Sequence, residues 1–269
     1  MKKTSSTLHP PSSILSKTPT KVGVFDSGIG GLTVVKSLLE HRLFEGIVYY
    51  GDTARVPYGV KDRNTIIRYA LEAVEFFKNF DIDLLIVACN TVSAYALDEM
   101  RAQAPFDVVG VVEPGILAAK NALDDTGAEV LVLGTKATVG SGAYQSLLDA
   151  HGYRNVEAKA TGLFVPIVEE GLFEGEVLQS AMHHYFAECK TPDAVILGCT
   201  HFPLIADAIG NYFDNRALLI HSGEAIVEYL ENHYYLNETA EKTELKFFAS
   251  ENPDGLRQVA ADWLKLERE

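Results

Sequence analysis

The chain has 269 residues, of which 47% are hydrophobic and 22% charged, and these proportions exclude a wholly disordered protein. Its formal net charge of −14 argues against a protein that binds nucleic acid through a basic surface. No apolar run reaches the roughly 18 residues that a membrane-spanning helix needs, and residues 1–20 lack the apolar core of a signal peptide, so we expect a cytoplasmic protein with no membrane partner.

Residues 1–20 are rich in Ser, Thr and Pro, which predicts a flexible N-terminal tail. From Lys21 onward, short β-branched runs alternate with longer stretches whose apolar residues have helical spacing. The short runs predict strands at Val22–Phe25, Ile47–Tyr50, Leu84–Ala88, Val108–Val111, Val130–Leu133, Asn155–Lys159, Ala194–Leu197, Ala217–Ile220 and Leu245–Ala249. The longer stretches predict helices at Leu32–His41, Asn64–Asn79, Ser93–Gln103, Pro114–Asp124, Ala143–Ala150, Glu176–Cys189, Leu204–Phe213, Gly223–Tyr234 and Asp254–Leu266. This alternation predicts an α/β fold with mostly parallel sheets.

Two segments of the chain resemble each other closely. Both DLLIVACNT (83–91) and DAVILGCTH (193–201) contain an Asp, an apolar run, a Cys six residues after the Asp, and a Thr within two residues of the Cys. VGVFDS (22–27) precedes Cys89 by about as many residues as VLVLGT (130–135) precedes Cys199. We therefore predict two similar α/β units that face each other across a cleft, each delivering one cysteine at the C-terminal end of a strand.

The three cysteines lack a Cys-x-x-Cys pair, which argues against a disulfide framework or a cysteine zinc site. Two thiols across a cleft could act as base and acid on opposite faces of an amino acid, and so invert its α-carbon. We expect a helix N-terminus after each strand to lower the thiol pKa and to offer N–H groups to a carboxylate. Cys189 has no matching context, and we interpret it as structural or incidental.

Neighbouring polar residues extend this hypothesis. Asp26 could assist Cys89 as His201 assists Cys199, although Asp26 could equally be an N-cap and His201 a satisfied, half-buried imidazole. The glycine-rich loop Asp26–Gly31 would let a small anion approach the backbone and the next helix. The polar segment GDTARVPYG (51–59) could reach the cleft, or its Asp52 and Thr53 could only satisfy loop backbone.

Three other interpretations stay open at this point. The two cysteines could be unrelated core residues, because free cysteine is often buried. A cysteine hydrolase could use Cys199 as nucleophile and His201 as base, which leaves Cys89 without a role. A binding protein could close two α/β lobes on an amino acid, which gives no reason for paired cysteines.

The motif set resembles that of the glutamate racemases in the aspartate/glutamate racemase superfamily, whose aspartate- and hydantoin-specific members remain an alternative. The matching segments are VFDSGIGGLTV (24–34), GDTARVPYG (51–59), ACNT (88–91), VEPG (112–115), VPIVEEG (165–171) and LGCTHFPL (197–204). The resemblance extends from Lys21 to nearly the end of the chain. It implies an isomerase that interconverts L- and D-glutamate without cofactor or metal and supplies D-glutamate for peptidoglycan synthesis, cell-wall biogenesis and cell shape.

The resemblance also implies roles for individual residues. Cys89 and Cys199 correspond to the catalytic pair, with Cys89 serving D-glutamate and Cys199 serving L-glutamate, and Asp26 and His201 assist them. An acidic residue of VPIVEEG takes part as well; we assign it to Glu169, with Glu170 as the alternative. The expected substrate contacts are Asp26, Ser27, Tyr58, Gly59, Asn90, Thr91, Thr135, Thr138, Thr200 and His201.

The family fold implies how the chain is divided. Residues 21–115 and 223–269 would form the first unit, which carries Cys89, and residues 116–222 the second, which carries Cys199. Members commonly form dimers, so we expect a homodimer. Because the tail before Lys21 is longer than in the shortest members, and some extended members are activated by a peptidoglycan precursor, such an activator is a further candidate partner.

Overall fold

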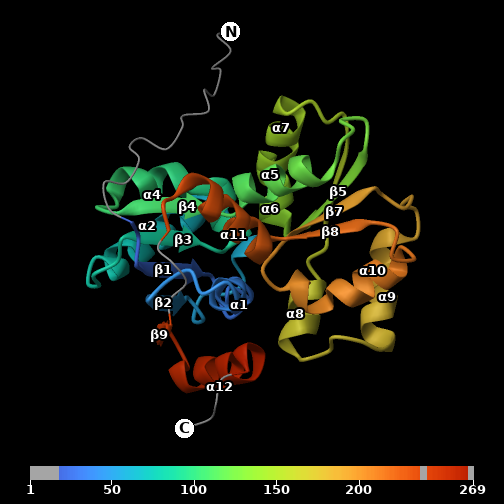
Figure 1. Ribbon diagram of the computed structural model, residues 1–269. Coiled ribbons are helices and arrows are strands. Elements are labelled where there is room, and N and C mark those ends of the chain that lie inside the picture. Colours follow the sequence, from blue (N-terminus) through green and yellow to red (C-terminus); the bar gives the residue numbers. More distant parts are fainter. Residues whose placement is uncertain (1–17, 237–240, 266–269) are drawn as a thin grey trace.

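The computed structural model describes residues 18–236 and 241–265. These residues contain two sheets of parallel strands, which lie side by side and are covered by helices (Figure 1). The first has five strands in the order β4-β3-β1-β2-β9, and the second has four in the order β6-β5-β7-β8. The strands are β1 Lys21–Asp26, β2 Gly46–Gly51, β3 Leu84–Val87, β4 Asp107–Gly110, β5 Glu129–Gly134, β6 Asn155–Ala160, β7 Ala194–Gly198, β8 Leu218–His221 and β9 Glu244–Ala249. All nine predicted strands and the α/β class are confirmed.

Twelve α-helices lie within the same residues. They are α1 Leu32–Glu40, α2 Arg63–Phe77, α3 Asn90–Tyr95, α4 Leu97–Gln103, α5 Val112–Ala122, α6 Lys136–Ser141, α7 Ala143–Ala150, α8 Phe164–Glu169, α9 Glu176–Phe186, α10 Ala206–Tyr212, α11 Ser222–His233 and α12 Pro253–Leu264. Short 3₁₀ helices cover Tyr58–Val60 and Phe202–Ile205.

The helix predictions need three corrections. The single helix expected over Ser93–Gln103 begins at Asn90 and is divided at Ala96, whose φ of −128° and ψ of 2° interrupt the helical backbone. The helices α6 and α8 were not predicted, because each has only six residues and too few turns to show a periodic pattern. The helix expected from Leu204 opens instead as a 3₁₀ turn. Of the expected segments, residues 1–17 of the tail and Leu266 lie outside the described residues.

The internal repeat is visible in the strand order. If β1 to β4 are matched with β5 to β8, both sheets have the same order, and the cysteine-bearing strand is parallel to the first strand of its unit in each. The repeated Asp has the same structural role in both units. Asp83 Oδ2 accepts the backbone N–H of Lys21 over 3.1 Å, and Asp193 Oδ2 accepts that of Glu129 over 2.7 Å. Each Asp thus satisfies a backbone donor at the start of the neighbouring strand.

Helices cover both faces of each sheet, which explains why the central strands are apolar throughout. In β3, Leu84 and Ile86 pack with α1, α11 and α12, while Leu85 and Val87 pack with α2 and α3 on the other face. In the second sheet, α8, α9 and α10 cover one face and α5 and α7 the other. Full burial of each such side chain stabilises the fold by roughly 1.5–3 kcal/mol.

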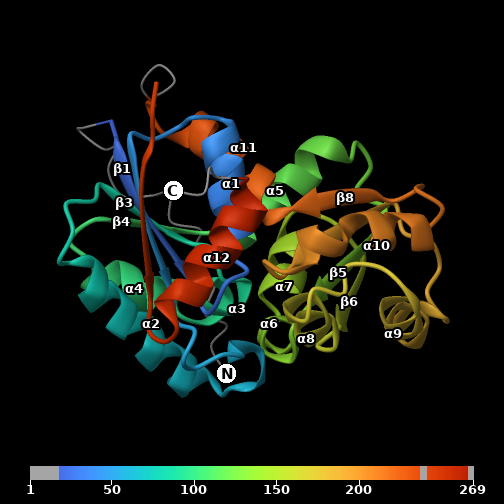
Figure 2. The same ribbon diagram turned by 90° about the horizontal axis from the view of Figure 1, so that it is seen from below.

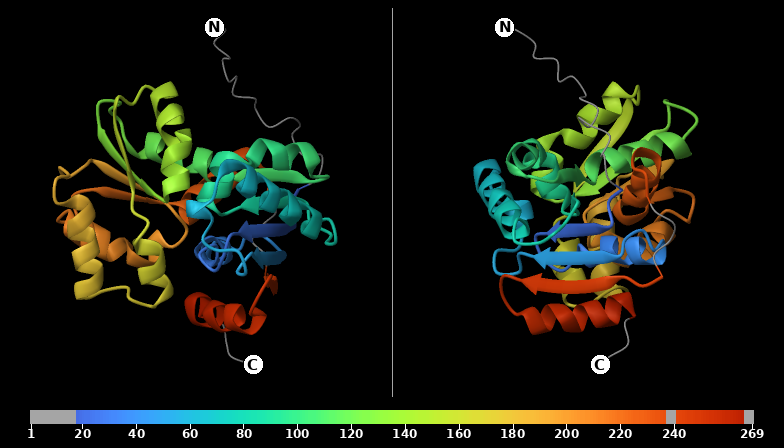
Figure 3. Two further views of the ribbon diagram at one scale, coloured as in Figure 1. Left: turned by 180° about the vertical axis from the view of Figure 1, so that it is seen from behind. Right: turned by 60° about the vertical axis from the view of Figure 1, so that its left-hand side comes forward.

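The C-terminal segment returns to the first sheet. Strand β9 pairs with β2 at the edge of that sheet (Figure 3), and Ile226 and Leu230 of α11 lie in its core. Helices α5 and α11 pack against each other between the two sheets (Figure 2). On this basis we propose the division expected from the sequence, with residues 21–115 and 223–269 in the first unit and 116–222 in the second. None of the helices within the described residues is long and apolar enough to cross a membrane.

Candidate active site

A pocket of about 400 Å³, including its open mouth, lies where the C-terminal ends of β3 and β7 approach each other. Cys89 follows β3 and Cys199 follows β7, and both thiols line the pocket although they are only 6% and 7% exposed. The complete lining consists of Ser27, Val56, Pro57, Tyr58, Gly59, Cys89, Asn90, Thr91, Thr135, Val165, Glu169, Gly198, Cys199, Thr200 and His201. One thiol from each of the two similar units therefore lines the pocket, as we predicted from the repeated segments.

Cys89 lies in an environment that favours its neutral thiol. Its Sγ donates to Ser27 Oγ over 3.5 Å. Burial raises the pKa of Cys89 to about 12, and the negative charge of Asp26 adds to the effect. The prediction that a helix N-terminus would lower this pKa is wrong, because Cys89 caps a helix of only six residues and the N–H of Val92 is outweighed by burial and by Asp26.

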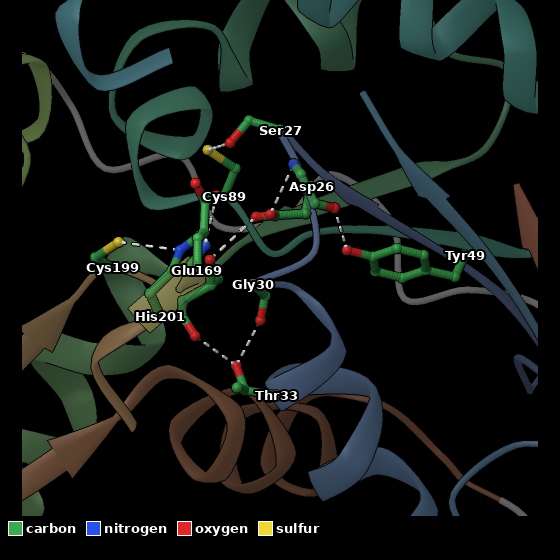
Figure 4. A network of polar contacts seen from close by, with 11 residues as sticks. Asp26, Ser27, Gly30, Thr33, Tyr49, Cys89, Glu169, Cys199 and His201 are labelled. Carbon is green, nitrogen blue, oxygen red and sulfur yellow. Dashed lines mark hydrogen bonds and ion pairs between the residues drawn. The ribbon is translucent and has the colours of Figure 1, made fainter. Parts of the chain in front are cut away.

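Cys199 lies beside an imidazole that is itself paired with a carboxylate (Figure 4). Cys199 Sγ is 3.8 Å from His201 Nδ1, and His201 Nε2 is 3.2 Å from Glu169 Oε1. Burial alone would lower the pKa of His201, but its contacts with Cys199 and Glu169 raise it to about 10. Unlike Cys89, Cys199 is not followed directly by an α-helix N-terminus, so the prediction is wrong here: a 3₁₀ turn follows, and α10 begins only at Ala206.

Glu169 occupies the pocket and Glu170 does not. Glu169 is the last residue of α8 and lines the pocket, whereas Glu170 follows the end of the helix and is not a lining residue. Glu169, which the sequence assigned first, is therefore the one of the two that lies at the pocket, and its part in the reaction stays a prediction.

Asp26 is fully buried behind the pocket, next to both units. Its Oδ2 accepts the Gly28 N–H over 3.1 Å, and its Oδ1 accepts the Thr200 hydroxyl over 3.3 Å. Burial raises the pKa of Asp26, and nearby His201 partly offsets the increase. Asp26 is not the N-cap of α1, since Gly31 has that position. Asp26 does not line the pocket, so any effect on substrate passes through its neighbours.

The glycine-rich loop packs against the second unit instead of opening onto the pocket. A Cβ atom on Gly30 would lie 2.4 Å from Thr200 Oγ1 and 2.7 Å from His201 Nδ1, so only glycine allows this approach. The hydroxyl of Thr33 donates to the carbonyl oxygens of Gly30 and Thr200, each at 2.9 Å (Figure 4). The N–H groups of Leu32 and Thr33 bind loop carbonyls. The anion site expected at this helix is therefore wrong: of residues 26–31, only Ser27 lines the pocket.

The segment 51–59 is held by side-chain contacts. The buried Asp52 carboxylate accepts Arg55 Nε over 2.6 Å and also the Tyr58 hydroxyl. Asp52 therefore binds two side chains of the loop, beyond any role in hydrogen-bonding the loop backbone. The Tyr58 hydroxyl donates to Asp52, which does not line the pocket. The loop places Val56 and Pro57 in the lining, which the sequence did not predict because apolar loop residues carry no chemical signature.

Three threonine hydroxyls form a cluster beside Cys89. Thr91 lies 3.0 Å from both Thr135 and Thr138, and these two are also 3.0 Å apart. Thr91 and Thr135 line the pocket, whereas Thr138 is fully buried and supports them. The cluster joins α3 of the first unit to the start of α6 in the second.

Tyr144, Val165 and Gly198 were not predicted from the sequence either. Val165 and Gly198 are lining residues, and Tyr144 donates to Asn90 Oδ1 over 2.6 Å. Tyr144 occupies an ordinary buried position of a helix, so its spacing gave no signal. Within residues 18–236 and 241–265, no group of three or more His, Cys, Asp or Glu side chains is arranged to hold a metal ion. The pocket's chemical groups are two thiols, an imidazole paired with a carboxylate, and several hydroxyl and amide groups.

Comparison with known proteins gives consistent matches over most of the chain. A family model described as Asp/Glu/Hydantoin racemase matches residues 33–230. A curated glutamate racemase from a Nitratiruptor species is 63% identical over 245 residues, covering 91% of this chain and 96% of the relative.

Solved structures agree with the sequence match. The glutamate racemase of Campylobacter jejuni subsp. jejuni superposes with a TM-score of 0.91 at 56% identity, covering 93% of this chain and 100% of that one. A glutamate racemase of Francisella tularensis in complex with D-glutamate gives 0.81 at 35% identity, covering 93% and 95%. The Escherichia coli glutamate racemase, in complex with L-glutamate and the activator UDP-MurNAc-ala, gives 0.72 at 26% identity, covering 91% and 95%.

Proposed function

Because the chain belongs to the Asp/Glu/Hydantoin racemase family, we propose that Cys89 and Cys199 are the two acid–base groups of a glutamate racemase. The protein is an isomerase that interconverts L- and D-glutamate, as its curated relatives are. One observation supports the assignment of the two thiols: they reach a single pocket from equivalent strands of two different sheets. In each direction one sulfur removes the α-proton and the other protonates the opposite face.

The environment of Cys89 supplies its starting protonation state in the proposed cycle. Cys89, with its raised pKa, rests as a thiol and therefore carries the proton that the opposite face of the substrate receives. His201 is cationic at neutral pH, and its positive charge stabilises a negative charge on the Cys199 sulfur 3.8 Å away. After each turnover the two sulfurs have exchanged roles. In the proposed cycle Cys199 removes the α-proton of L-glutamate, and Cys89 removes that of D-glutamate once it has lost its own proton.

The remaining residues either contact the substrate or hold the pocket side chains in position. Ser27, Asn90, Thr91, Thr135 and Thr200 present polar groups to the pocket, and Tyr58 and Gly59 close one side. Glu169 holds His201, Thr138 supports the threonine cluster, and Asp26 binds Thr200 from behind.

Cofactor independence is part of the proposal, because the pocket already provides an acid and a base for the two faces of the substrate. We further propose that the enzyme acts in the cytoplasm as a homodimer and supplies D-glutamate for peptidoglycan. The activator named for the Escherichia coli relative supports a nucleotide-linked muramyl compound as a regulatory partner here.

Solvent isotope exchange tests the reaction directly. Purified protein treated with a metal chelator is incubated with L-glutamate in D₂O without added cofactor, and the α-proton signal and optical rotation are followed together. A two-base reaction places deuterium in newly formed D-glutamate while the unreacted L-glutamate still carries protium. Deuterium appearing first in recovered L-glutamate would contradict two bases, and no exchange from L-glutamate would contradict the activity.

A further inference from the structure

A buried hydrogen-bond network connects the two cysteine-bearing segments behind the pocket. The Tyr144 hydroxyl donates to Asn90 Oδ1 over 2.6 Å, and Asn90 Nδ2 donates to Ser222 Oγ over 3.3 Å. The Ser222 hydroxyl donates to the carbonyl of Leu197 over 3.4 Å, two residues before Cys199. Tyr144, Asn90 and Ser222 are 1%, 2% and 4% exposed, so water cannot easily replace these partners.

The network allows one orientation of the Asn90 amide. Burial raises the pKa of Tyr144, so its hydroxyl stays protonated and needs an acceptor. Since Ser222 donates to Leu197, its oxygen is left to accept from Asn90. A rotated amide would leave the Tyr144 hydroxyl without an acceptor in the interior, where unpaired polar groups are costly.

The fixed orientation determines what Asn90 offers to a ligand. Asn90 lines the pocket directly after Cys89, and one N–H of its Nδ2 is not used by the contacts with Tyr144 and Ser222. The Tyr144 ring also packs against the end of β7: a Cβ atom on Gly198 would lie 3.3 Å from Tyr144 Cε2. Tyr144 of the second unit therefore contacts the segments that precede Cys199 and follow Cys89, without lining the pocket.

We propose that Tyr144 is a positioning residue: through Asn90 it fixes an N–H donor that binds a carboxylate of glutamate in the pocket. This inference rests on the proposed function of the pocket. It assigns to the donor a role in binding substrate, and not in the proton transfers that the thiols perform.

The test compares two buried tyrosines. Tyr144 and Tyr153 are each 1% exposed, belong to the same core cluster, and donate one hydrogen bond, but Tyr153 donates to the Leu123 carbonyl. We expect Tyr144→Phe to raise KM for both enantiomers about ten-fold, equivalent to about 1.4 kcal/mol for one hydrogen bond, with a much smaller change in kcat. Tyr153→Phe should leave KM unchanged, with comparable loss of thermal stability. Equal kinetics in the two variants would overturn the proposal.

A double-mutant cycle checks that Tyr144 acts through Asn90. In an Asn90→Ala background, Tyr144→Phe should raise KM no further, and an undiminished ten-fold effect would contradict the proposal. If Tyr144→Phe does not fold, Ser222→Ala tests the other contact of the amide. It should also raise KM, although by less because Tyr144 still holds Asn90 Oδ1, and an unchanged KM would count against the network. Absence of racemisation in the unsubstituted protein would refute the proposed function instead.

Discussion

The contact between Glu169 and His201 makes a quantitative prediction for Glu169→Gln. The carboxylate lies 3.2 Å from His201 Nε2, and its side chain is 36% exposed while that of His201 is 7% exposed. A hydrogen bond to a charged group contributes about 1.5–3 kcal/mol, and the exposure of Glu169 reduces this toward the lower figure. One pKa unit corresponds to about 1.4 kcal/mol, so the pKa of His201 should fall by about one unit from its value of about 10.

The effect on stability has a defined sign. The folded pKa of His201 is raised above its usual 6.5, so the protonated imidazole stabilises the fold fully below pH 6.5, and this stabilisation is lost as the pH rises through about 10. Glu169→Gln should therefore reduce the free energy of unfolding by about 1.4 kcal/mol at pH 7. The difference should disappear above the folded pKa of the unsubstituted protein.

Two measurements examine this prediction. NMR titration of the His201 ring gives its pKa directly, and urea unfolding at neutral and strongly alkaline pH gives the stability difference. Glu170→Gln is a matched control, because Glu170 is the exposed neighbour at the same helix end. An unchanged His201 titration in Glu169→Gln would refute the view that Glu169 contributes to the raised pKa of His201.

Three further changes have expected outcomes. Gly30→Ala should destabilise the protein by about 1–3 kcal/mol and lower kcat at least ten-fold, because the new Cβ overlaps Thr200 and His201. Unfolding and racemisation assays measure the two effects, and a fully active variant would contradict the close packing of Gly30. Cys189→Ser should leave the racemisation rate unchanged, because Cys189 contacts Lys159 and Tyr185 and does not line the pocket. Removing residues 1–18 should abolish any rate response to UDP-MurNAc-Ala, and a retained response would exclude a role of the tail in activation.

The sequence predicted the strands well because both faces of the sheets are covered. β3 and β7 are apolar at every position, and their common Asp-to-Cys spacing revealed the duplicated unit. Local patterns could not show where the helices begin and end. The division at Ala96 has no Gly or Pro to mark it, and α6 and α8 are too short to display a period.

The sequence predicted most residues of the candidate site but not the hydrogen bonds that connect them. Most of the expected contacts line the pocket, since most of them follow closely after a strand at the edge where the units meet, while Tyr58 and Gly59 reach it from a 3₁₀ helix. Asp26 and Thr138 instead support lining residues from behind. The raised pKa of Cys89 could not be foreseen, because it results from burial and from an Asp far away in the sequence. Tyr144 was missed because its function depends on a contact between the two units.

The most direct test of the two-thiol account is to measure racemisation from each enantiomer in separate Cys89→Ser and Cys199→Ser variants, with Cys189→Ser as control. The account predicts that each of the first two loses activity in both directions by at least about 100-fold, in keeping with the contribution of a general acid or base, while the control retains it. Full turnover in Cys89→Ser together with an inactive Cys199→Ser would contradict the two-base mechanism and favour a single nucleophilic cysteine.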